Sequence, residues 1–388
     1  MRCELSDICV YRNERISTNA LNSHTYVSTE NMLPDKGGIT DAASLPTVSQ
    51  TSKFRYGDTL VSNIRPYFKK IWFAEYDGGC SNDVLVFSAK EGVDPKYLYY
   101  VLANDSFFAY STATSKGTKM PRGDKTSIMQ YQIEKVDSPT QKKIAAILSA
   151  LDEKIATNRA INDNLERQLR TIFKAEFTDN PELENITQIP LSELCHVVTK
   201  GTTPTTLGKP FVESGINFIK AESILDDHSI DKSKFAFIDE ETNALLKRSI
   251  IHAGDVVFTI AGTLGRFALI DENVLPANTN QAVAIIRADV EKVLPEYIYT
   301  CFIGEWHTDY YAKRVQQAVQ ANLSLTTIKS LPIPLLDKAK MSEYLSLILP
   351  LIKAIKTNEA QNEKLAALRD NLLSKLMSGE IDVSAVQL

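Results

Sequence analysis

Residues 138–177 read SPTQKKIAAILSALDEKIATNRAINDNLERQLRTIFKAEF and predict one long amphipathic helix. Ser138 is suited to cap it, Pro139 to its first turn and Gln141 to a capping box. Apolar side chains then recur three and four residues apart, at Ile144, Leu148, Leu151, Ile155, Leu165, Leu169 and Ile172. With its boundaries, the predicted helix covers 138–178.

A second stretch of the same kind covers 338–378. Its apolar positions include Ile348, Ile352, Ile355, Leu365, Leu368 and Leu372. Both stripes have polar middles, at Asn158, Asn162, Glu359 and Asn362. Their period is close to 3.5, which is typical of a coiled-coil seam, so we expect an antiparallel pair whose register the polar residues fix. The alternative is that each helix packs only on its own domain. Pro350 is expected to kink or restart the second helix.

The chain around these helices is duplicated. The matching segments are Leu5–Cys9 with Leu191–Cys195, Tyr56–Val61 with Ala253–Phe258, Pro95–Tyr99 with Pro295–Tyr299, and Thr157-Asn158 with Thr357-Asn358. A repeat of this length is too long for a solenoid and indicates two similar domains. We therefore predict an α+β fold, with two pseudo-repeated globular α/β domains, over 1–137 and 185–335, joined by two long antiparallel coiled-coil helices.

Composition limits the class of protein. The chain has 388 residues, 44% of them hydrophobic, and a net charge of -5, so it can bury real cores and is not a globally basic binder. Its five cysteines are scattered without a CxxC pair, which argues against a disulfide framework and against a metal site. With no signal-peptide core and no membrane-length apolar stretch, we expect a cytoplasmic protein without membrane contact. Nucleotide-binding and hydrolase motifs are missing, so no catalytic residues are predicted.

Local basic segments in the first domain are candidates for DNA binding. Arg65, Lys69 and Lys70 flank the aromatic residues Tyr67, Phe68 and Trp72. A second, glycine-containing loop contributes Lys116, Lys119, Arg122 and Lys125. Glycine allows the backbone to approach a phosphate, and Lys and Arg neutralise its charge. The alternative is an ordinary solvated loop.

The second domain offers hydroxyl and amide side chains instead. Its candidates are Lys200, Thr202, Thr203, Thr205, Asn280, Gln281, Gln317, Gln320 and Asn322. Amides hydrogen-bond adenine through two atoms, and hydroxyls contact phosphates or bases. Thr and Asn also favour turns and caps, so turn chemistry is an equal alternative.

Several of these runs resemble the DNA-specificity subunit of type I restriction–modification systems. They are Gly254–Arg266, Asn280–Val283, Asn322–Ser324, Leu331–Pro334, Gly201–Pro204 and, in the first half, Gln141–Ala145. The resemblance covers nearly the whole chain in the right order, and it adds Arg266 to the expected DNA contacts. The first domain lacks the AGTxG segment, and the second helix begins with Lys340–Glu343 instead of a glutamine-led start.

The resemblance implies two target-recognition domains, each reading one half of a split sequence in double-stranded DNA. Two methyltransferase subunits would bind the helices, carry S-adenosylmethionine and methylate adenine at N6, and a motor–nuclease subunit would use ATP and Mg. The chain itself would have no active site and no cofactor. A helix of about 39 residues is roughly 58 Å long, enough for half-sites about one DNA turn apart. Two alternatives are a duplicated coiled-coil scaffold that binds only proteins and an enzyme of unrecognised type.

Overall fold

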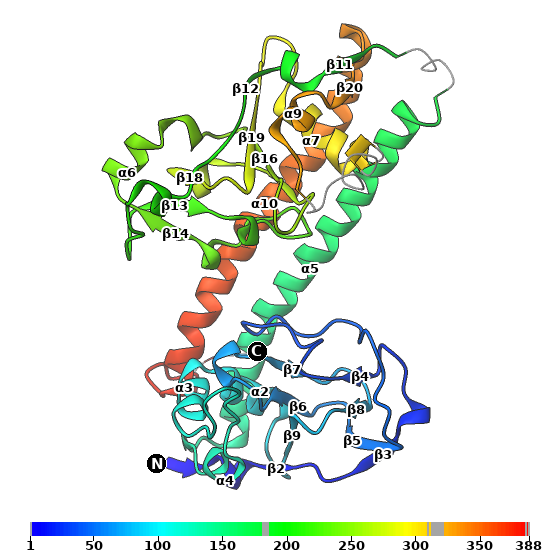
Figure 1. Cartoon of the computed structure of the whole chain (residues 1–388). Coiled ribbons are helices and arrows are strands. Elements are labelled where there is room, and N and C mark those ends of the chain that lie inside the picture. Colours follow the sequence, from blue (N-terminus) through cyan, green and yellow to red (C-terminus); the bar gives the residue numbers. More distant parts are fainter. Residues whose placement is uncertain (1, 181–185, 309, 312–321, 385, 387–388) are drawn as a thin grey trace. The chain divides into compact units, whose positions relative to one another are not determined.

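The computed structural model divides into two compact units (Figure 1). Unit 1 comprises Met1–Ile155 and Glu363–Leu388, and unit 2 comprises Ala156–Asn362. The residues that the structure describes are 2–180, 186–308, 310–311, 322–384 and 386.

Unit 1 is built on two four-stranded sheets and a strand pair. The first sheet has the order β2 (Cys9–Tyr11), β9 (Val84–Ala89), β6 (Thr59–Ser62) and β7 (Ile71–Phe73). The second has the order β3 (Arg15–Ser17), β5 (Gln50–Phe54), β8 (Gly78–Cys80) and β4 (Tyr26–Val27), and β1 (Arg2–Glu4) pairs with β10 (Gln132–Glu134). The helical elements are α1 (Leu5–Ile8), α2 (Pro95–Ala103), α3 (Asp105–Ala113), α4 (Lys125–Met129), and the 3-10 turns η1 (Thr18–Ala20) and η2 (Pro66–Phe68).

Unit 2 repeats this plan. Its first sheet has the order β12 (Cys195–Lys200), β19 (Val283–Ala288), β16 (Val256–Thr259) and β17 (Phe267–Leu269). Its second sheet has the order β14 (Ala236–Ile238), β13 (Ile216–Ile219), β18 (Ala277–Thr279) and β15 (Ile250–Ile251). The strand pair is β11 (Gln188–Pro190) with β20 (Pro332–Pro334). The helices are α6 (Glu240–Leu245), α7 (Pro295–Ile303) and α9 (Leu325–Lys329). The 3-10 turns are η4 (Leu191–Glu193), η5 (Pro204–Leu207), η6 (Ala221–Ser223), η7 (Lys232–Lys234), η8 (Lys247–Ser249) and η9 (Glu272–Val274).

The predicted duplication is confirmed at the level of strand pairing. In unit 1, β8 pairs parallel with β4 and antiparallel with β5; in unit 2, β18 pairs parallel with β13 and antiparallel with β15. The fourth strand differs, because β3 joins the β5 edge whereas β14 joins the β13 edge. Two copies of one three-stranded unit have therefore been extended on opposite edges.

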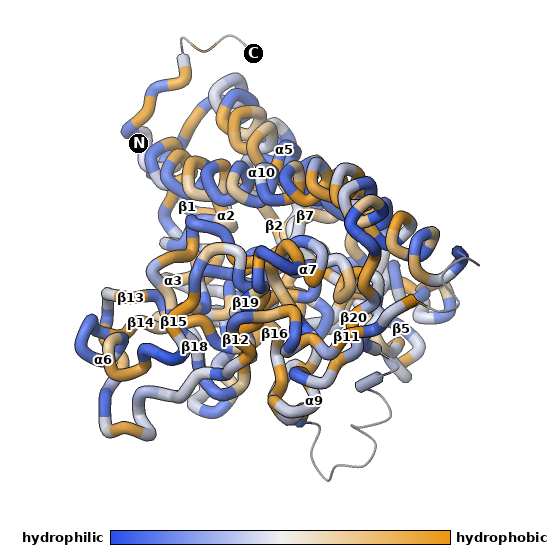
Figure 2. The backbone as a smooth tube through the Cα atoms, turned by 90° about the horizontal axis from the view of Figure 1, so that it is seen from above, coloured by the Kyte–Doolittle hydropathy of each residue, from blue (hydrophilic) through white to orange (hydrophobic). Residues whose placement is uncertain are grey.

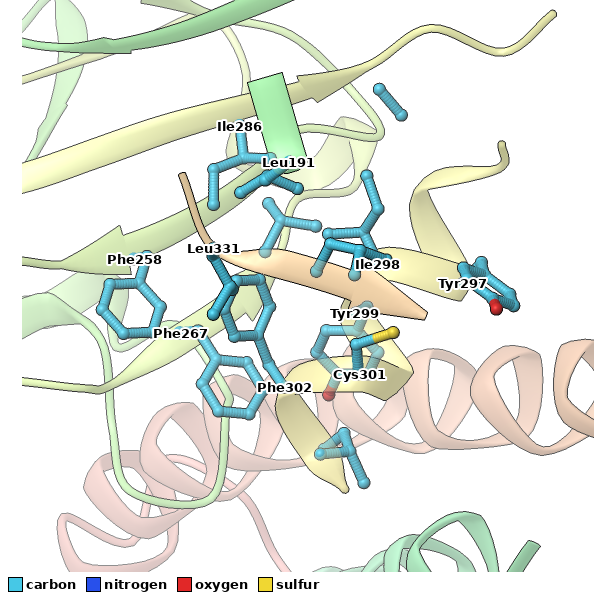
Figure 3. Packing of buried hydrophobic residues seen from close by; sticks show 14 of the residues in the cluster. Leu191, Phe258, Phe267, Ile286, Tyr297, Ile298, Tyr299, Cys301, Phe302 and Leu331 are labelled. Carbon is cyan, nitrogen blue, oxygen red and sulfur yellow. The ribbon is translucent and has the colours of Figure 1, made fainter. Parts of the chain in front are cut away.

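The core of unit 2 lies between its first sheet, helix α7 and the long helices (Figure 3). Phe258 of β16 packs against Phe302 of α7 with ring centroids 5.1 Å apart, and both side chains are essentially inaccessible to solvent. Leu169 and Ile348, from the two predicted stripes, belong to the same cluster. Burying each such side chain contributes about 1.5–3 kcal/mol. The stripes therefore also pack on the domain core, as the alternative held.

A buried carboxylate occupies the same position in both units and is neutralised from different strands. In unit 1, Asp58 accepts hydrogen bonds from Nε and Nη2 of Arg12, and that Nη2 also contacts Ser88 of β9. In unit 2, Asp255 accepts from Nε and Nη2 of Arg287, both at 2.7 Å. Arg287 lies on β19 at the position equivalent to Ser88 in the strand register. An arginine therefore pairs with the buried carboxylate in both units, but Arg12 and Arg287 come from different positions of the repeated fold.

The long helices are α5 (Ser138–Phe177) and α10 (Lys338–Met377), along which hydrophobic and hydrophilic residues alternate (Figure 2). The expected cap at Ser138 is wrong. Asp137 caps α5 instead, because its Oδ1 accepts from the Thr140 N–H at 2.9 Å. Gln141 makes no capping box; it donates to the Val136 carbonyl and accepts from the Asp94 N–H, which ties α5 to the start of α2.

Two further expectations about α10 need correction. The helix is one element through Pro350, so it does not restart there. Leu368 is 48% exposed and therefore lies outside the seam, whereas the neighbouring Leu373 is buried with Ile144 and Leu148 of α5. Arg369 occupies the inner face instead and pairs with Asp152 of α5. The heptad pattern predicted Leu368 in the seam, but the ion pair between Arg369 and Asp152 lies there instead.

The polar middles of the helices contact one another inside unit 2. Asn158 is fully buried, and its Nδ2 donates to Oε1 of Gln361 (2.9 Å) and Oδ1 of Asn362 (2.8 Å). One turn further along α5, Asn162 accepts from Asn358 at 2.8 Å. As the residue number rises on α5 it falls on α10, so the pair is antiparallel. Amides that hydrogen-bond one another in only one register fix the alignment of the helices.

Candidate nucleic-acid interface

The two basic segments of unit 1 lie against each other. The connection from β6 to β7 contains η2, and the Arg65 N–H just before it donates to the Pro121 carbonyl at 2.8 Å. Lys116 and Arg122 exchange two backbone hydrogen bonds and close the loop into a small hairpin. Gly123 then donates to the Asn63 carbonyl at 3.1 Å. We call residues 64–70 and 116–125 the basic loop surface.

The cations of this surface fall into two groups. Lys69 pairs with Asp105 at 3.1 Å, and Lys70 donates to the Thr29 carbonyl at 2.6 Å, where burial lowers the pKa of its amine. Both side chains are therefore engaged in contacts within unit 1. Lys116, Lys119, Arg122 and Lys125 are exposed to solvent.

Two of the exposed cations carry ion pairs. Lys116 contacts Asp124, whose pKa this hydrogen bond lowers to about 2, and Arg122 contacts Asp83 at 3.3 Å. Within the described ranges, Lys119 and Lys125 have no carboxylate partner. These two are the cations whose full charge is available to a phosphate.

In unit 2 the structure brings the two hydroxyl and amide segments together. The Gly201 N–H donates to the Asn280 carbonyl at 3.1 Å, and Thr203 donates to Oε1 of Gln281 through both its backbone and its hydroxyl. The Asn280 side chain accepts from the Ala282 N–H at 3.0 Å. We call residues 200–206 and 279–282 the amide loop surface. Because Oε1 of Gln281 is engaged, only its exposed Nε2 is ready to donate to a base.

The remaining candidates of unit 2 are placed as follows. Lys200 and Thr202 are half-buried and Thr205 is exposed on the amide loop surface. Arg266 forms two 2.6 Å hydrogen bonds with Asp226, so its charge is already neutralised. Asn322 is exposed, and Gln317 and Gln320 lie outside the described residues.

Sequence reasoning passed over two cations beside the amide loop surface. Lys247 and Arg248 of η8 are exposed, and Nη2 of Arg248 donates to the Lys200 carbonyl at 3.5 Å. The Lys-Arg dipeptide is the signal that could have revealed them. They add positive charge beside this surface, whose own cation is the half-buried Lys200.

One junction of the fold is repeated in the two units. In unit 1 the residue before the α4 cap, Gly123, donates to Asn63 at the end of β6; in unit 2 Leu323, before the α9 cap, donates to Ile260 at the end of β16 (2.9 Å). The residue that precedes the cap of a short helix therefore meets the end of a central strand in both copies. In unit 1 this junction belongs to the basic loop surface, and in unit 2 it lies outside the amide loop surface.

The described part of the chain contains no group of three or more His, Cys, Asp or Glu residues placed to hold a metal ion. It also contains no helix whose length and hydropathy would allow it to cross a membrane.

Comparison with known proteins agrees with this architecture. The model of the type I restriction modification DNA specificity domain matches twice, over residues 2–167 and 184–367. The HindI specificity subunit of Haemophilus influenzae is 23% identical, with 97% of this chain and 98% of the relative covered. The MjaIX specificity subunit of Methanocaldococcus jannaschii is 25% identical, with 76% of this chain and 71% of the relative covered.

The fold is also that of a solved specificity subunit. The S subunit of a type I system from M. genitalium superposes with a TM-score of 0.56 at 15% identity, covering 97% of this chain and 96% of that one. Both copies of the family domain, in chain order, account for both units. The chain therefore belongs to the family of DNA-specificity subunits of type I restriction–modification systems.

Proposed function

We propose that each unit reads one half of a split target in double-stranded DNA, unit 1 through the basic loop surface and unit 2 through the amide loop surface. The observation that carries this proposal is that each unit brings two basic or polar segments, distant in the sequence, together into one surface. The two surfaces differ in chemistry, so the two half-sites differ in sequence. A duplicated scaffold that binds only proteins has no need for either surface.

The paired helices are the proposed docking site for two methyltransferase subunits. The two helices contain matching segments, Thr157-Asn158 and Thr357-Asn358, and a repeated segment suits two copies of one partner. In this proposal the partners carry the chemistry: S-adenosylmethionine for adenine N6 methylation, and ATP with Mg in a motor–nuclease subunit. In this proposal the complex acts on the genome in the cytoplasm.

A map of N6-methyladenine in cells with and without this gene tests the proposal. We expect loss of one motif composed of two short half-sites around a fixed gap. An unchanged methylome, together with no DNA binding by the purified chain in complex with its methyltransferase, would support the protein-only scaffold.

Removing the free cations of the basic loop surface should weaken DNA binding independently of sequence. For Lys119→Ala with Lys125→Ala, each lost phosphate contact reduces the slope of log affinity against log salt by about 0.9. Titrations of target and non-target duplexes at several salt concentrations measure that slope. Lys53→Ala, which removes a cation from strand β5, is the control and should leave it unchanged. Equal slopes in all variants would remove these lysines from the interface.

Gln281→Ala should relax the preference at one base pair of the half-site read by unit 2. Loss of a good base contact reduces discrimination by about 1–3 kcal/mol. Methylome mapping of the variant shows which position becomes degenerate. Thr203→Val is the matched control, because it removes the hydroxyl partner of Gln281 and leaves the amide in place. If Thr203→Val causes the same degeneracy, the amide acts by ordering the loop and not by contacting the base.

A further inference from the structure

Two aromatic side chains at the tip of the basic loop surface are exposed. Tyr67 is 48% and Phe68 38% accessible, and their ring centroids lie 4.7 Å apart. Met120 of the adjoining loop is 45% accessible. Single exposed apolar side chains are ordinary, but two exposed rings in contact, with a third exposed apolar residue on the adjoining loop, form a feature that needs a partner.

The backbone that carries these rings is held in an unfavourable conformation. Arg65 and Lys69, on either side of η2, have φ angles of 51° and 50°. Asp35 and Lys36, also at positive φ, donate their N–H groups to the carbonyls of Phe68 (2.8 Å) and Lys69 (3.0 Å). Four of the six non-glycine residues with positive φ in the described chain are therefore in this one clamp.

Residues with side chains are strained at such φ angles and persist there only where the surrounding structure enforces them, often at binding sites. Here the enforced turn keeps two large rings out of the core and in fixed positions. A rigid, preorganised aromatic group loses little conformational entropy when it binds. The clamp therefore favours a binding role for the rings over a packing role.

The surroundings of the rings indicate what they contact. The adjoining loop, whose Pro121 carbonyl accepts from the Arg65 N–H, carries the exposed cations Lys119 and Arg122. Nε of Arg65 is buried without a hydrogen-bond partner among the described residues. Aromatic rings between cations bind nucleic acid by stacking on bases while the cations neutralise the backbone. A protein partner with a hydrophobic surface would not require this charge.

We infer that Tyr67 and Phe68 form an aromatic wedge that stacks on the bases of the half-site read by unit 1 and unstacks one base step there. Inserted apolar side chains of this kind open base steps in DNA. This inference rests on the proposed function, because it names how one of the two surfaces acts on its half-site.

Unit 2 has no wedge. Its corresponding connection, between β16 and β17, is residues 260–266, Ile-Ala-Gly-Thr-Leu-Gly-Arg, with no aromatic residue. Gly262 and Gly265 provide its positive φ angles, so no strained side chain is held there. The two half-sites are therefore expected to differ in distortion: the first is unstacked and the second is not.

The test uses the full chain in complex with its methyltransferase and duplexes carrying 2-aminopurine, whose fluorescence rises on unstacking. The probe is placed at each position of both half-sites except the adenines that are methylated, because those are extruded in any case. We expect enhanced fluorescence at one step of the half-site read by unit 1 only. Tyr67→Ala with Phe68→Ala should abolish it and weaken target binding about 30-fold or more, since two base–aromatic stacks are lost and each contributes at least about 1 kcal/mol.

Two controls separate the wedge from the rest of the surface. Leu264→Ala, in the corresponding connection of unit 2, should change neither the fluorescence nor the affinity. Tyr67→Leu with Phe68→Leu keeps apolar volume without aromatic faces and should lose most of the affinity if stacking is the mechanism. Unchanged fluorescence and affinity in the alanine pair, while Lys119→Ala with Lys125→Ala still lowers the salt slope, would overturn the wedge and leave the proposed function standing. If every variant, including the lysine pair, kept full DNA binding, both the wedge and the proposed function would be contradicted.

Discussion

Gly201→Ala is expected to abolish recognition of the half-site read by unit 2. A Cβ at this position would lie 1.8 Å from the Thr279 carbonyl oxygen and 2.8 Å from the Asn280 nitrogen. Both obstacles are backbone of the β18–β19 connection, so no side-chain rotation relieves the clash. The two segments of the amide loop surface must move apart, which breaks the Gly201–Asn280 and Thr203–Gln281 hydrogen bonds.

Overpacking of this severity costs about 3 kcal/mol or more, which corresponds to roughly a hundredfold loss of binding. Methylation of single-site plasmids by the complex measures it, with targets altered in one half-site at a time. The variant should discriminate at the unit 1 half-site and no longer at the unit 2 half-site. Gly92→Ala is the control, because no atom lies within 4 Å of its added Cβ, so any loss that it shows comes from its positive φ and not from a clash. Retained discrimination at both half-sites would show that the close contact is dispensable.

Asp255→Asn is expected to destabilise unit 2 by about 3–5 kcal/mol. The carboxylate is fully buried and accepts two hydrogen bonds from Arg287 and one from the His252 N–H. Removing its charge leaves the guanidinium of Arg287, only 26% accessible, without a counter-ion. Breaking a buried pair costs far more than the pair contributes net, because the remaining charge stays desolvated.

Hydrogen exchange followed by mass spectrometry locates the effect. Amides of β16 and β19 should exchange faster in Asp255→Asn, and those of β6 and β9 should not change. Asp58→Asn is the matched variant of unit 1, and it should show the opposite pattern because its partner is Arg12. Equal acceleration in both units from either substitution would mean that the two cores do not unfold separately.

Sequence alone determined the plan of this protein. Long-range periodicity identified both helices, because apolar residues three and four apart must share a face whatever surrounds them. Collinear matches such as Gly57-Asp58 with Gly254-Asp255 identified the duplication, because both copies need the same turn before a buried strand. The resemblance to specificity subunits followed from motifs that are local in sequence, and the family comparison confirmed it.

The tertiary structure alone decided which candidate residues are available to DNA. Lys69, Lys70 and Arg266 are indistinguishable from Lys119 and Lys125 in the sequence, yet the first three are bound to the chain's own oxygens. The necessity of Gly201 depends on a carbonyl 78 residues away at Thr279, and the exposure of Tyr67 depends on a clamp supplied by residues 35 and 36. A local pattern records what a residue can do, but partners distant in the chain decide whether its charge, its rings or its missing side chain faces the solvent or the fold.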